Sequence, residues 1–224
     1  MLTIGVVDDN IGGLYLASKL RAALPCNYIC LLCAKPFGGA KRKMFERAEE
    51  CVDKLQSAGC DAVVLAPVAL GFVGRALSQR GRSVYYCETP ILHAATYTVS
   101  NILVVSCDEQ RDKLPVDNVI SVHMPRFTEL AEAGNEQNMV DYIAECAEGY
   151  SGQFDCIALG HSSMNGYKRC FKRVFPNAQV FDSVDGVVRR MRKKYRKHCK
   201  DDGELTVVDD DWNDVTEKYA LLLR

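Results

Sequence analysis

Short, continuous apolar runs that alternate with amphipathic stretches constrain the fold of this 224-residue chain more than any other feature. Runs that are apolar at every position, instead of at every second one, are typical of parallel strands covered by helices on both faces. In the first half, strands are predicted at residues 4–7, 28–33, 62–65 and 83–86, and helices at residues 14–24, 41–58 and 72–79. This order predicts an α/β fold built on a parallel sheet.

The pattern restarts near the middle of the chain. Strands are predicted at residues 101–105, 118–122, 156–159 and 180–182, with a helix at residues 136–148. We therefore expect two similar Rossmann-like or flavodoxin-like parallel-sheet halves that face a shared cleft. The first is expected to span residues 1–96, with residues 184–224 packing back on it, and the second residues 97–183. A final amphipathic helix is expected to end at Arg224.

Composition argues against several classes of protein. The formal net charge of −1 gives the chain as a whole no attraction to nucleic acid or membranes. No apolar run approaches the roughly 20 residues that cross a bilayer, and the N-terminal residues are typical of a strand and not of a signal peptide. We expect a cytoplasmic protein with no membrane partner, whereas a homodimer is left open.

Eleven cysteines are many for a chain of this length. Their number is odd, and Cys30 and Cys33 form the one C-x-x-C motif, with no second pair to complete a zinc site. Several cysteines lie in or beside apolar runs, where a thiol behaves as a small hydrophobic group. We expect reduced, mostly buried thiols, and neither a metal nor a cofactor.

The strongest local charge is the run of basic residues at 189–198. One interpretation is a contact surface for RNA, phosphate or acidic lipid. The other is a solvated helix face, partly balanced by the acidic residues at 201–211. Tyr195 is the one aromatic ring interleaved with the cations, which favours the solvated face, so no nucleic-acid partner is expected.

Polar or reactive residues follow several of the predicted strands. Because ligands of such folds bind beyond the carboxyl ends of the strands, these residues are expected to border the cleft: Asp8, Asp9, Cys33, Pro67, Cys107 and His161. Asp8 and Asp9 have two interpretations, binding of an amine or cation and capping of the helix that begins near Ile11. His161 either hydrogen-bonds in a polar cleft or acts as a single acid or base, since an imidazole titrates near neutrality.

The order of four short motifs resembles the glutamate racemase family of the aspartate/glutamate racemase superfamily. Residues 8–13, DDNIGG, are similar to that family's DSGxGG, and residues 36–38, PFG, to its PYG. Residues 129–134 resemble the segment that carries an assisting glutamate, and residues 181–183, FDS, are similar to a late IDS segment. The resemblance covers nearly the whole chain and implies the fold of two α/β halves.

The two family loops that carry catalytic cysteines differ in this chain. The family sequences ACNT and GCTH correspond to residues 66–69, APVA, and residues 160–163, GHSS. Pro67 and His161 thus stand where the resemblance implies the two thiols that move the α-proton of the substrate. Proline has neither an acid or base nor a backbone donor. The resemblance therefore implies a divergent member that lacks both catalytic cysteines.

The resemblance also implies a set of site residues. The titratable residues that remain at family positions are the candidates for catalysis: His161, Asp8 and Glu132. The candidates for ligand binding are Asp9, Asn10, Pro36, Phe37, Gly38, Pro67, Val68, Ser162 and Ser163. Backbone amides of the PFG loop are implied to hold a ligand carboxylate. Pro67 and Val68 are implied to make the adjoining wall more apolar than a glutamate site needs.

Three functions are compatible with these residues. The first is a racemase-like protein without two-thiol racemase activity that binds a small carboxylate or anionic ligand in the cleft. The second is an active isomerase, racemase or lyase on an amino acid or small carboxylic acid, using His161 with Asp8 or Glu132. The third is an interaction module based on the basic helix at residues 189–200. Cys33 and Cys107, if they faced one another, would restore a two-base site at new positions.

Overall fold

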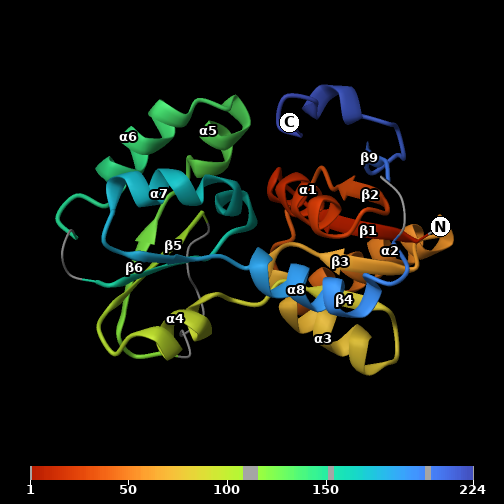
Figure 1. Cartoon of the computed structure of the whole chain (residues 1–224), viewed down its shortest axis with the longest axis horizontal. Coiled ribbons are helices and arrows are strands. Elements are labelled where there is room, and N and C mark those ends of the chain that lie inside the picture. The colour runs from red at the N-terminus through yellow and green to blue at the C-terminus, as the bar shows by residue number, and fades with distance from the viewer. Residues whose placement is uncertain (1, 108–115, 151–153, 200–202, 224) are drawn as a thin grey trace. The chain divides into compact units, whose positions relative to one another are not determined.

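The computed structural model describes residues 2–107, 116–150, 154–199 and 203–223 (Figure 1). The chain divides into two compact units, Met1–Glu88 with Val184–Arg224, and Thr89–Ser183. The segment that follows residue 183 thus belongs to the first unit. Helix α4 (Ile91–Tyr97) lies in the second unit and spans residue 96, where we expected the boundary.

The first unit is built on a five-stranded parallel sheet, in the strand order β4-β3-β1-β2-β9. The strands are β1 (Thr3–Asp8), β2 (Asn27–Leu32), β3 (Ala62–Leu65), β4 (Val84–Tyr86) and β9 (Leu205–Val208). The helices are α1 (Gly12–Ala23), α2 (Lys41–Ser57), α3 (Gly71–Gln79) and α8 (Val184–Tyr195), with the short 3₁₀ helices η1 (Val68–Leu70) and η3 (Thr216–Tyr219). Parallel strands separated by helices confirm the predicted α/β fold.

The sheet of the first unit is buried because its strands carry apolar residues on both faces. Val7, Val63 and Leu65 lie in one hydrophobic core with residues of α2 and α3. On α2 the buried positions are Ala48, Cys51, Val52 and Leu55, the spacing of one helix face. Helix α1 contacts α8 as well as β1 and β2. Both faces of the sheet are thus occupied by helices.

The C-terminal segment differs from the sequence prediction. We expected one amphipathic helix ending at Arg224, but the chain forms strand β9, which pairs in parallel with β2, and then the short helix η3. The chain turns at Trp212, which has a φ of 63°, and the amide of Val215 then donates to the carbonyl of Val207. The predicted helix was wrong because the apolar residues of this segment are consecutive instead of spaced along one helix face, and Leu221 is 81% exposed.

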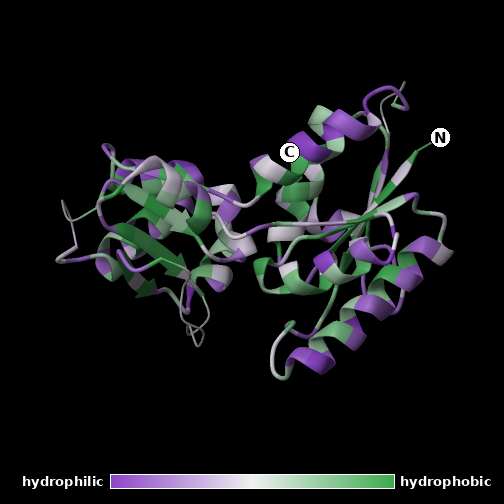
Figure 2. Cartoon of the chain, turned by 90° about the horizontal axis from the view of Figure 1, so that it is seen from below, coloured by the Kyte–Doolittle hydropathy of each residue, from purple (hydrophilic) through white to green (hydrophobic). Residues whose placement is uncertain are grey.

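The second unit is built on a four-stranded parallel sheet, in the strand order β6-β5-β7-β8. The strands are β5 (Ile102–Ser106), β6 (Val119–His123), β7 (Cys156–Leu159) and β8 (Gln179–Phe181). The helices are α4, α5 (Phe127–Ala133), α6 (Glu136–Cys146) and α7 (Lys168–Val174), with the 3₁₀ helix η2 (Ser162–Tyr167). Figure 2 shows hydrophobic residues concentrated on the strands of this unit and hydrophilic residues on its helices and loops.

Local signals explain where α5 ends and α6 begins. Gly134 has a φ of 68°, the left-handed conformation that ends many helices, and Asn135 caps α6 by accepting a hydrogen bond from the Asn138 amide.

Of the eleven cysteines, all of which are free thiols, eight are buried. No helix in the described ranges is long and apolar enough to span a membrane.

Candidate active site

The carboxyl ends of β5 and β7 lie side by side in the second unit, because these two strands pair along their length. Cys107 follows β5, and the segment from Gly160 to Ser163 follows β7. The amide of Gly160 donates to the carbonyl of Val105 at 2.7 Å. A Cβ atom at Gly160 would lie 2.8 Å from that carbonyl oxygen, closer than real Cβ atoms come. A glycine at this position therefore lets the loop start directly against β5.

Ser163 is the centre of the polar cluster that this loop forms. Its hydroxyl lies 2.8 Å from Nδ1 of His161, 3.1 Å from Oγ1 of Thr128 and 3.6 Å from Sγ of Cys107. Thr128 also donates to the Cys107 sulfur at 3.6 Å. Ser163 is only 2% exposed, whereas His161, Thr128 and Cys107 are half-buried. One buried hydroxyl thus connects an imidazole, a thiol and a second hydroxyl.

The contacts of His161 fix the position of its proton. Nδ1 accepts a hydrogen bond from the backbone amide of Ser163 at 3.4 Å, and this contact caps helix η2. A backbone N–H can only donate, so Nδ1 carries no proton and the Ser163 hydroxyl donates to it as well. The neutral imidazole therefore carries its proton on Nε2. In this state His161 offers a hydrogen-bond donor, and not a base, through Nε2.

The other predicted residues of the second unit have different surroundings. Ser162 is buried beside His161, at the start of η2. Glu132 is exposed on α5, one helical turn after Thr128. Sequence reasoning missed Thr128, because it lies on a seven-residue helix that gives almost no periodic signal.

Asn165 is a second polar residue of this unit that the sequence did not single out. It is 1% exposed on η2, and its amide nitrogen donates to Ser183 at 3.1 Å. Its carbonyl oxygen is buried with no hydrogen-bond partner in the described structure. Such an acceptor costs about 1–3 kcal/mol unless a water or a ligand satisfies it.

In the first unit, the predicted residues Asp8, Asp9 and Asn10 form a cluster after β1. Oδ1 of Asp8 accepts hydrogen bonds from the Asp9 amide at 2.8 Å and from the Asn10 side chain at 2.9 Å. Asn10 in turn accepts from the Gly12 amide at 2.8 Å and thereby supports the first turn of α1. A Cβ atom at Gly13 would lie 2.5 Å from the Cβ of Asp8. Asp8 is therefore fully buried under the start of α1.

The backbone amides of the predicted PFG loop already have acceptors. Pro36 has no N–H, Gly38 donates to the Pro36 carbonyl at 3.0 Å, and the Phe37 amide donates to the carboxylate of Asp9. Asp9 also accepts from the Asn10 side chain, at 2.8 Å. The amide that the resemblance assigns to a ligand carboxylate is thus bound by a carboxylate of the chain itself. Asp9 spans from the β1 loop to the Phe37 loop and does not cap α1.

Arg47, which the sequence analysis did not identify, holds the same loop from α2. Its guanidinium donates to the carbonyls of Lys35 and Pro36 and lies 4.6 Å from the centroid of the Phe37 ring.

Pro67 is buried after β3, where its carbonyl accepts a hydrogen bond from the Leu70 amide, at the end of η1. Val68 beside it is half-buried, so neither residue places an acid or base there.

Cys33 and Cys107 do not belong to one cluster within a unit. Cys33 lies in the first unit with its sulfur 3.6 Å from that of Cys51, and Cys107 lies in the second. The Cys33 thiol donates to Cys51, which lowers the pKa of Cys51, with a further contribution from Arg47. The same hydrogen bond and burial raise the pKa of Cys33.

Among the residues described, no three His, Cys, Asp or Glu side chains gather in a way that would hold a metal ion.

The fold and the strand-end polar clusters define a two-unit parallel α/β protein with the architecture of the glutamate racemases. Three solved structures of these enzymes cover most of the chain. The Thermus thermophilus enzyme in complex with β-chloro-D-alanine aligns over 98% of this chain and 91% of its own, with a TM-score of 0.77 and 19% identity. The Campylobacter jejuni enzyme aligns over 99% and 96%, with a TM-score of 0.72 and 17% identity. The Francisella tularensis enzyme in complex with D-glutamate aligns over 93% and 88%, with a TM-score of 0.69 and 15% identity.

These similarities establish the fold that the sequence motifs predicted. No protein-family model and no curated protein matches the chain. With identities below 20%, the similarity concerns the arrangement of strands and helices and not the residues of the site.

Proposed function

We propose that this protein binds a small carboxylate, or a small anion of similar size, at the loop that follows β7, with His161 as the hydrogen-bond donor. The observation that carries the proposal is the capping contact at Nδ1 of His161, because it leaves the ring proton on Nε2. A donor on a half-buried imidazole suits a carboxylate oxygen. Two structural neighbours were solved with amino-acid ligands, D-glutamate and β-chloro-D-alanine, which supports this ligand class.

We further propose that the chain does not racemise glutamate by a two-thiol route. Two-base racemisation needs one acid or base on each face of the α-carbon. The position that the resemblance assigns to one thiol holds Pro67, which has no proton to exchange, and the other holds His161. Losing one such group typically costs about 10²–10⁴ in rate. Racemisation of glutamate at the rate of a normal enzyme would contradict this proposal.

A thermal-shift titration with D-glutamate, L-glutamate and a panel of small carboxylic acids tests the binding site. We expect at least one acid to raise the melting temperature of the wild-type protein and to lose this effect in His161→Ala. His93→Ala is the matched control, because His93 is an exposed histidine of the same unit, on α4. Equal stabilisation of His161→Ala and of the wild type would place the ligand elsewhere.

A second candidate function is a one-base isomerase or lyase that uses Cys107. The supporting observation is the continuous path from Sγ of Cys107 to Oγ of Ser163, at 3.6 Å, and on to Nδ1 of His161, at 2.8 Å. Along this path Ser163 gives its proton to Nδ1 and receives the thiol proton of Cys107. The products are an imidazolium, a neutral serine and a thiolate that can remove an α-proton. This path does not include Asp8 or Glu132, the residues that the sequence analysis gives as candidate partners of His161.

Incubation with amino acids in deuterated water separates the two candidates. Deuterium that appears at the α-carbon, and that is lost in Cys107→Ala but kept in Cys146→Ala, would establish the one-base activity. Cys146 is the matched control because it is another half-buried thiol of the second unit. If exchange is also lost in Cys33→Ala, Cys33 and Cys107 would instead form the two-base site at new positions that the sequence analysis considers. Binding without exchange would support the ligand-binding function alone.

A further inference from the structure

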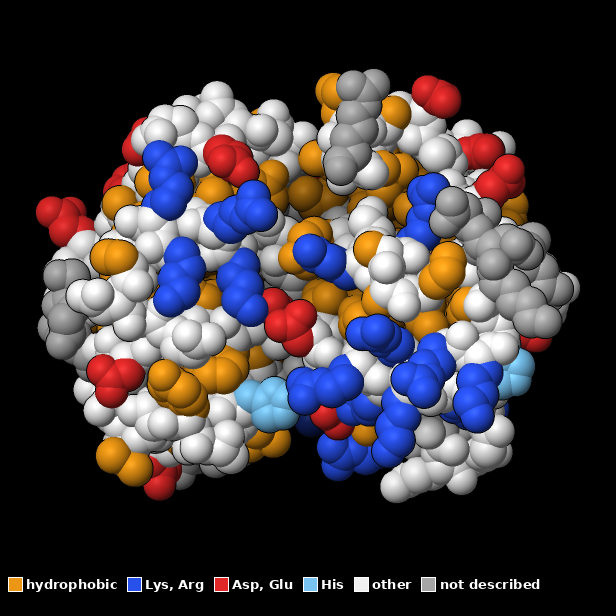
Figure 3. All heavy atoms as spheres, in the orientation of Figure 1, with side chains coloured by type: hydrophobic (Ala, Val, Ile, Leu, Met, Phe, Trp, Pro, Cys, Tyr) orange, Lys and Arg blue, Asp and Glu red, His pale blue; other side chains and the backbone are white. Residues whose placement is uncertain are grey.

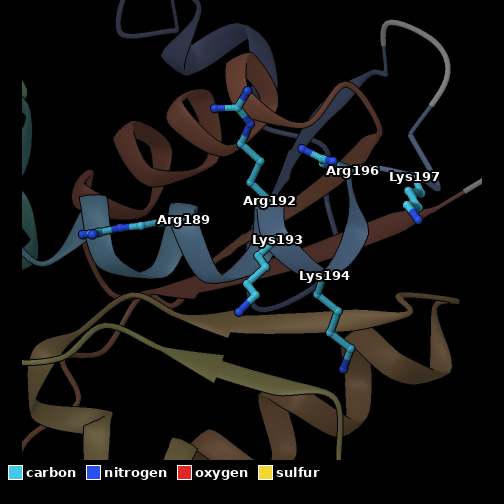
Figure 4. Close-up of a pocket in the computed structure, with 6 residues that line it drawn as sticks. All are labelled: Arg189, Arg192, Lys193, Lys194, Arg196 and Lys197. Carbon is cyan, nitrogen blue, oxygen red and sulfur yellow. The ribbon is translucent and has the colours of Figure 1, made fainter.

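Helix α8 divides its residues between two opposite faces. Val184, Val187, Met191 and Tyr195 are buried against the first unit. The other face carries five exposed cations, which we call the basic face: Arg189, Arg192, Lys193, Arg196 and Lys197. Their spacing of three and four residues puts them in one stripe along the helix and the turn that follows it. Figure 3 shows lysine and arginine side chains gathering over α8, and Figure 4 shows those of the basic face spread along the helix.

Within the part of the chain that the structure describes, the cations of the basic face have no carboxylate partner. Some other cations of the chain pair with carboxylates, as Arg42 does with Glu46 at 2.8 Å and Arg190 with Glu88 at 2.9 Å. None of the five residues of the basic face forms an ion pair with any residue that the structure describes. Like charges three or four residues apart on a helix destabilise it by a few tenths of a kcal/mol per pair. The stripe thus opposes the stability of α8.

The basic face also borders a surface hollow. With Lys194, its five residues line a volume of about 580 Å³ (Figure 4). Lys194 and Arg190 border a second hollow, of about 230 Å³, which includes Ser83, Tyr85 and Tyr86. The positive surface is therefore continuous from α8 to the edge strand β4. Its lining offers guanidinium, ammonium and hydroxyl donors.

The chemistry of this surface favours a phosphate polymer over a protein or a membrane. The basic face runs from Arg189 to Lys197, nine residues along α8 and the turn that follows it, or about 12 Å at the rise of a helix, which is long enough to meet several phosphates of one strand. Arginine donates two parallel hydrogen bonds to a phosphate. Protein interfaces need aromatic or aliphatic anchors and are poor in lysine, and the stripe has no apolar residue. Membrane-bound amphipathic helices expose an apolar face, but that of α8 is buried.

We propose that the basic face of α8 binds the sugar–phosphate backbone of a nucleic acid without reading its base sequence. The expectation from sequence alone was a solvated face. The structure adds two facts to the sequence: the absence of carboxylate partners among the described residues, and the continuity with the second hollow. The net charge of −1 does not oppose the proposal, since binding responds to the local field more than to the total. The basic face belongs to the first unit and the proposed carboxylate site to the second.

Fluorescence anisotropy of a labelled 20-nucleotide RNA and of a duplex of mixed sequence tests the proposal with the full chain. With three to five phosphate contacts, the slope of log K against log salt should be roughly −2 to −4 for the single strand. Replacing three cations of the face, in Arg192→Glu/Lys193→Glu/Arg196→Glu, should weaken binding at least tenfold and flatten the slope. A neutral version with glutamine in place of glutamate should give a smaller loss.

The matched control is Lys43→Glu/Arg75→Glu/Arg169→Glu, which changes the net charge equally at exposed positions on the helices α2, α3 and α7. We expect this variant to bind within about threefold of the wild type at 150 mM salt. Equal losses in both triple variants would mean that only the net charge matters, and would overturn the proposal. No binding at 50 mM salt would overturn it too. Tight binding to phosphatidylserine vesicles that neither RNA nor duplex displaces would assign the surface to a membrane instead.

Discussion

The bond between Asp9 and the Phe37 amide makes a quantitative prediction for the first unit. Asp9→Ala removes the carboxylate that accepts from this amide and from the Asn10 side chain. The Asn10 side chain keeps its bond to Asp8, at 2.9 Å, so little is lost there. Phe37 is only 7% exposed, which leaves its amide poorly placed to find water. A hydrogen bond to a charged acceptor contributes about 1.5–3 kcal/mol, and this is the expected loss of unfolding free energy.

The same variant should become sensitive to small carboxylates. The vacated position has the size of one carboxylate, and the Phe37 amide again needs an acceptor. If acetate binds there with a Kd of about 20 mM, 200 mM acetate restores about 1.4 kcal/mol by binding the folded state alone. The wild-type protein should gain nothing from this position, because Asp9 already fills it.

Fluorescence of Trp212 is a suitable assay, since it is the only tryptophan of the chain and belongs to the first unit. Asp9→Ala should melt roughly 5–15 °C below the wild type, and 200 mM sodium acetate should recover part of this loss relative to 200 mM sodium chloride. Asp61→Ala is the control, because Asp61 also accepts from a backbone amide, that of Thr3 at 2.8 Å, but at an exposed position. Equal effects of acetate on all three proteins would refute the reasoning.

Three further predictions concern packing, the polar cluster and pH. Gly160→Ala should destabilise the second unit by about 1–3 kcal/mol in calorimetry, because its Cβ would meet a backbone oxygen. In contrast, Gly186→Ala, on an open part of α8, should stabilise the first unit by up to about 1 kcal/mol. Ser163→Ala should lower the hydrogen-exchange protection of β7 and η2 by about 1–2 kcal/mol, since it removes the hydroxyl shared by three side chains. Burial raises the pKa of Cys60 to about 12. An unfolded thiol ionises near pH 8.5. The contribution of the buried, protonated Cys60 thiol to stability is therefore fully present below that pH and is lost as the pH rises toward 12. Between pH 8 and pH 10, the free energy of unfolding, measured by urea denaturation, should therefore fall by up to about 2 kcal/mol less in Cys60→Ala than in the wild type.

Several elements could be predicted from the sequence because their apolar residues carry the signal locally. β1, β3 and β7 are apolar at almost every position, and α2 buries one regular stripe. Strand β9 was not predicted: it is an edge strand that pairs with β2, and only two of its four residues are buried, whereas all four residues of β3 and of β7 are. Helices α4, α5 and α7 have seven residues each, too few for a helical period to stand out.

The site could be predicted in part for a similar reason. The residues that follow a strand are set by chain order, and this placed His161 and Asp9 at strand ends in advance. Their partners depend on packing across the fold: Thr128 reaches Ser163 from α5, and Asp9 reaches the Phe37 loop across 28 residues of sequence. No local pattern in the sequence specifies such contacts. The resemblance to a family supplied the positions of the residues but not their protonation or hydrogen bonds.

The two polar clusters lead to one conclusion about chemistry on this fold. A residue that exchanges protons must be able to gain and lose them in the geometry in which it is held. His161 is held with Nδ1 as the acceptor of a helix cap, so taking a proton there would break the contacts that position it. Asp9 is likewise held in place as the acceptor for the Phe37 amide. Both side chains are therefore engaged in hydrogen bonds that fix the geometry of their own loops. A common fold does not imply a common reaction, and these contacts are the reason why we propose recognition of an anion before proton transfer.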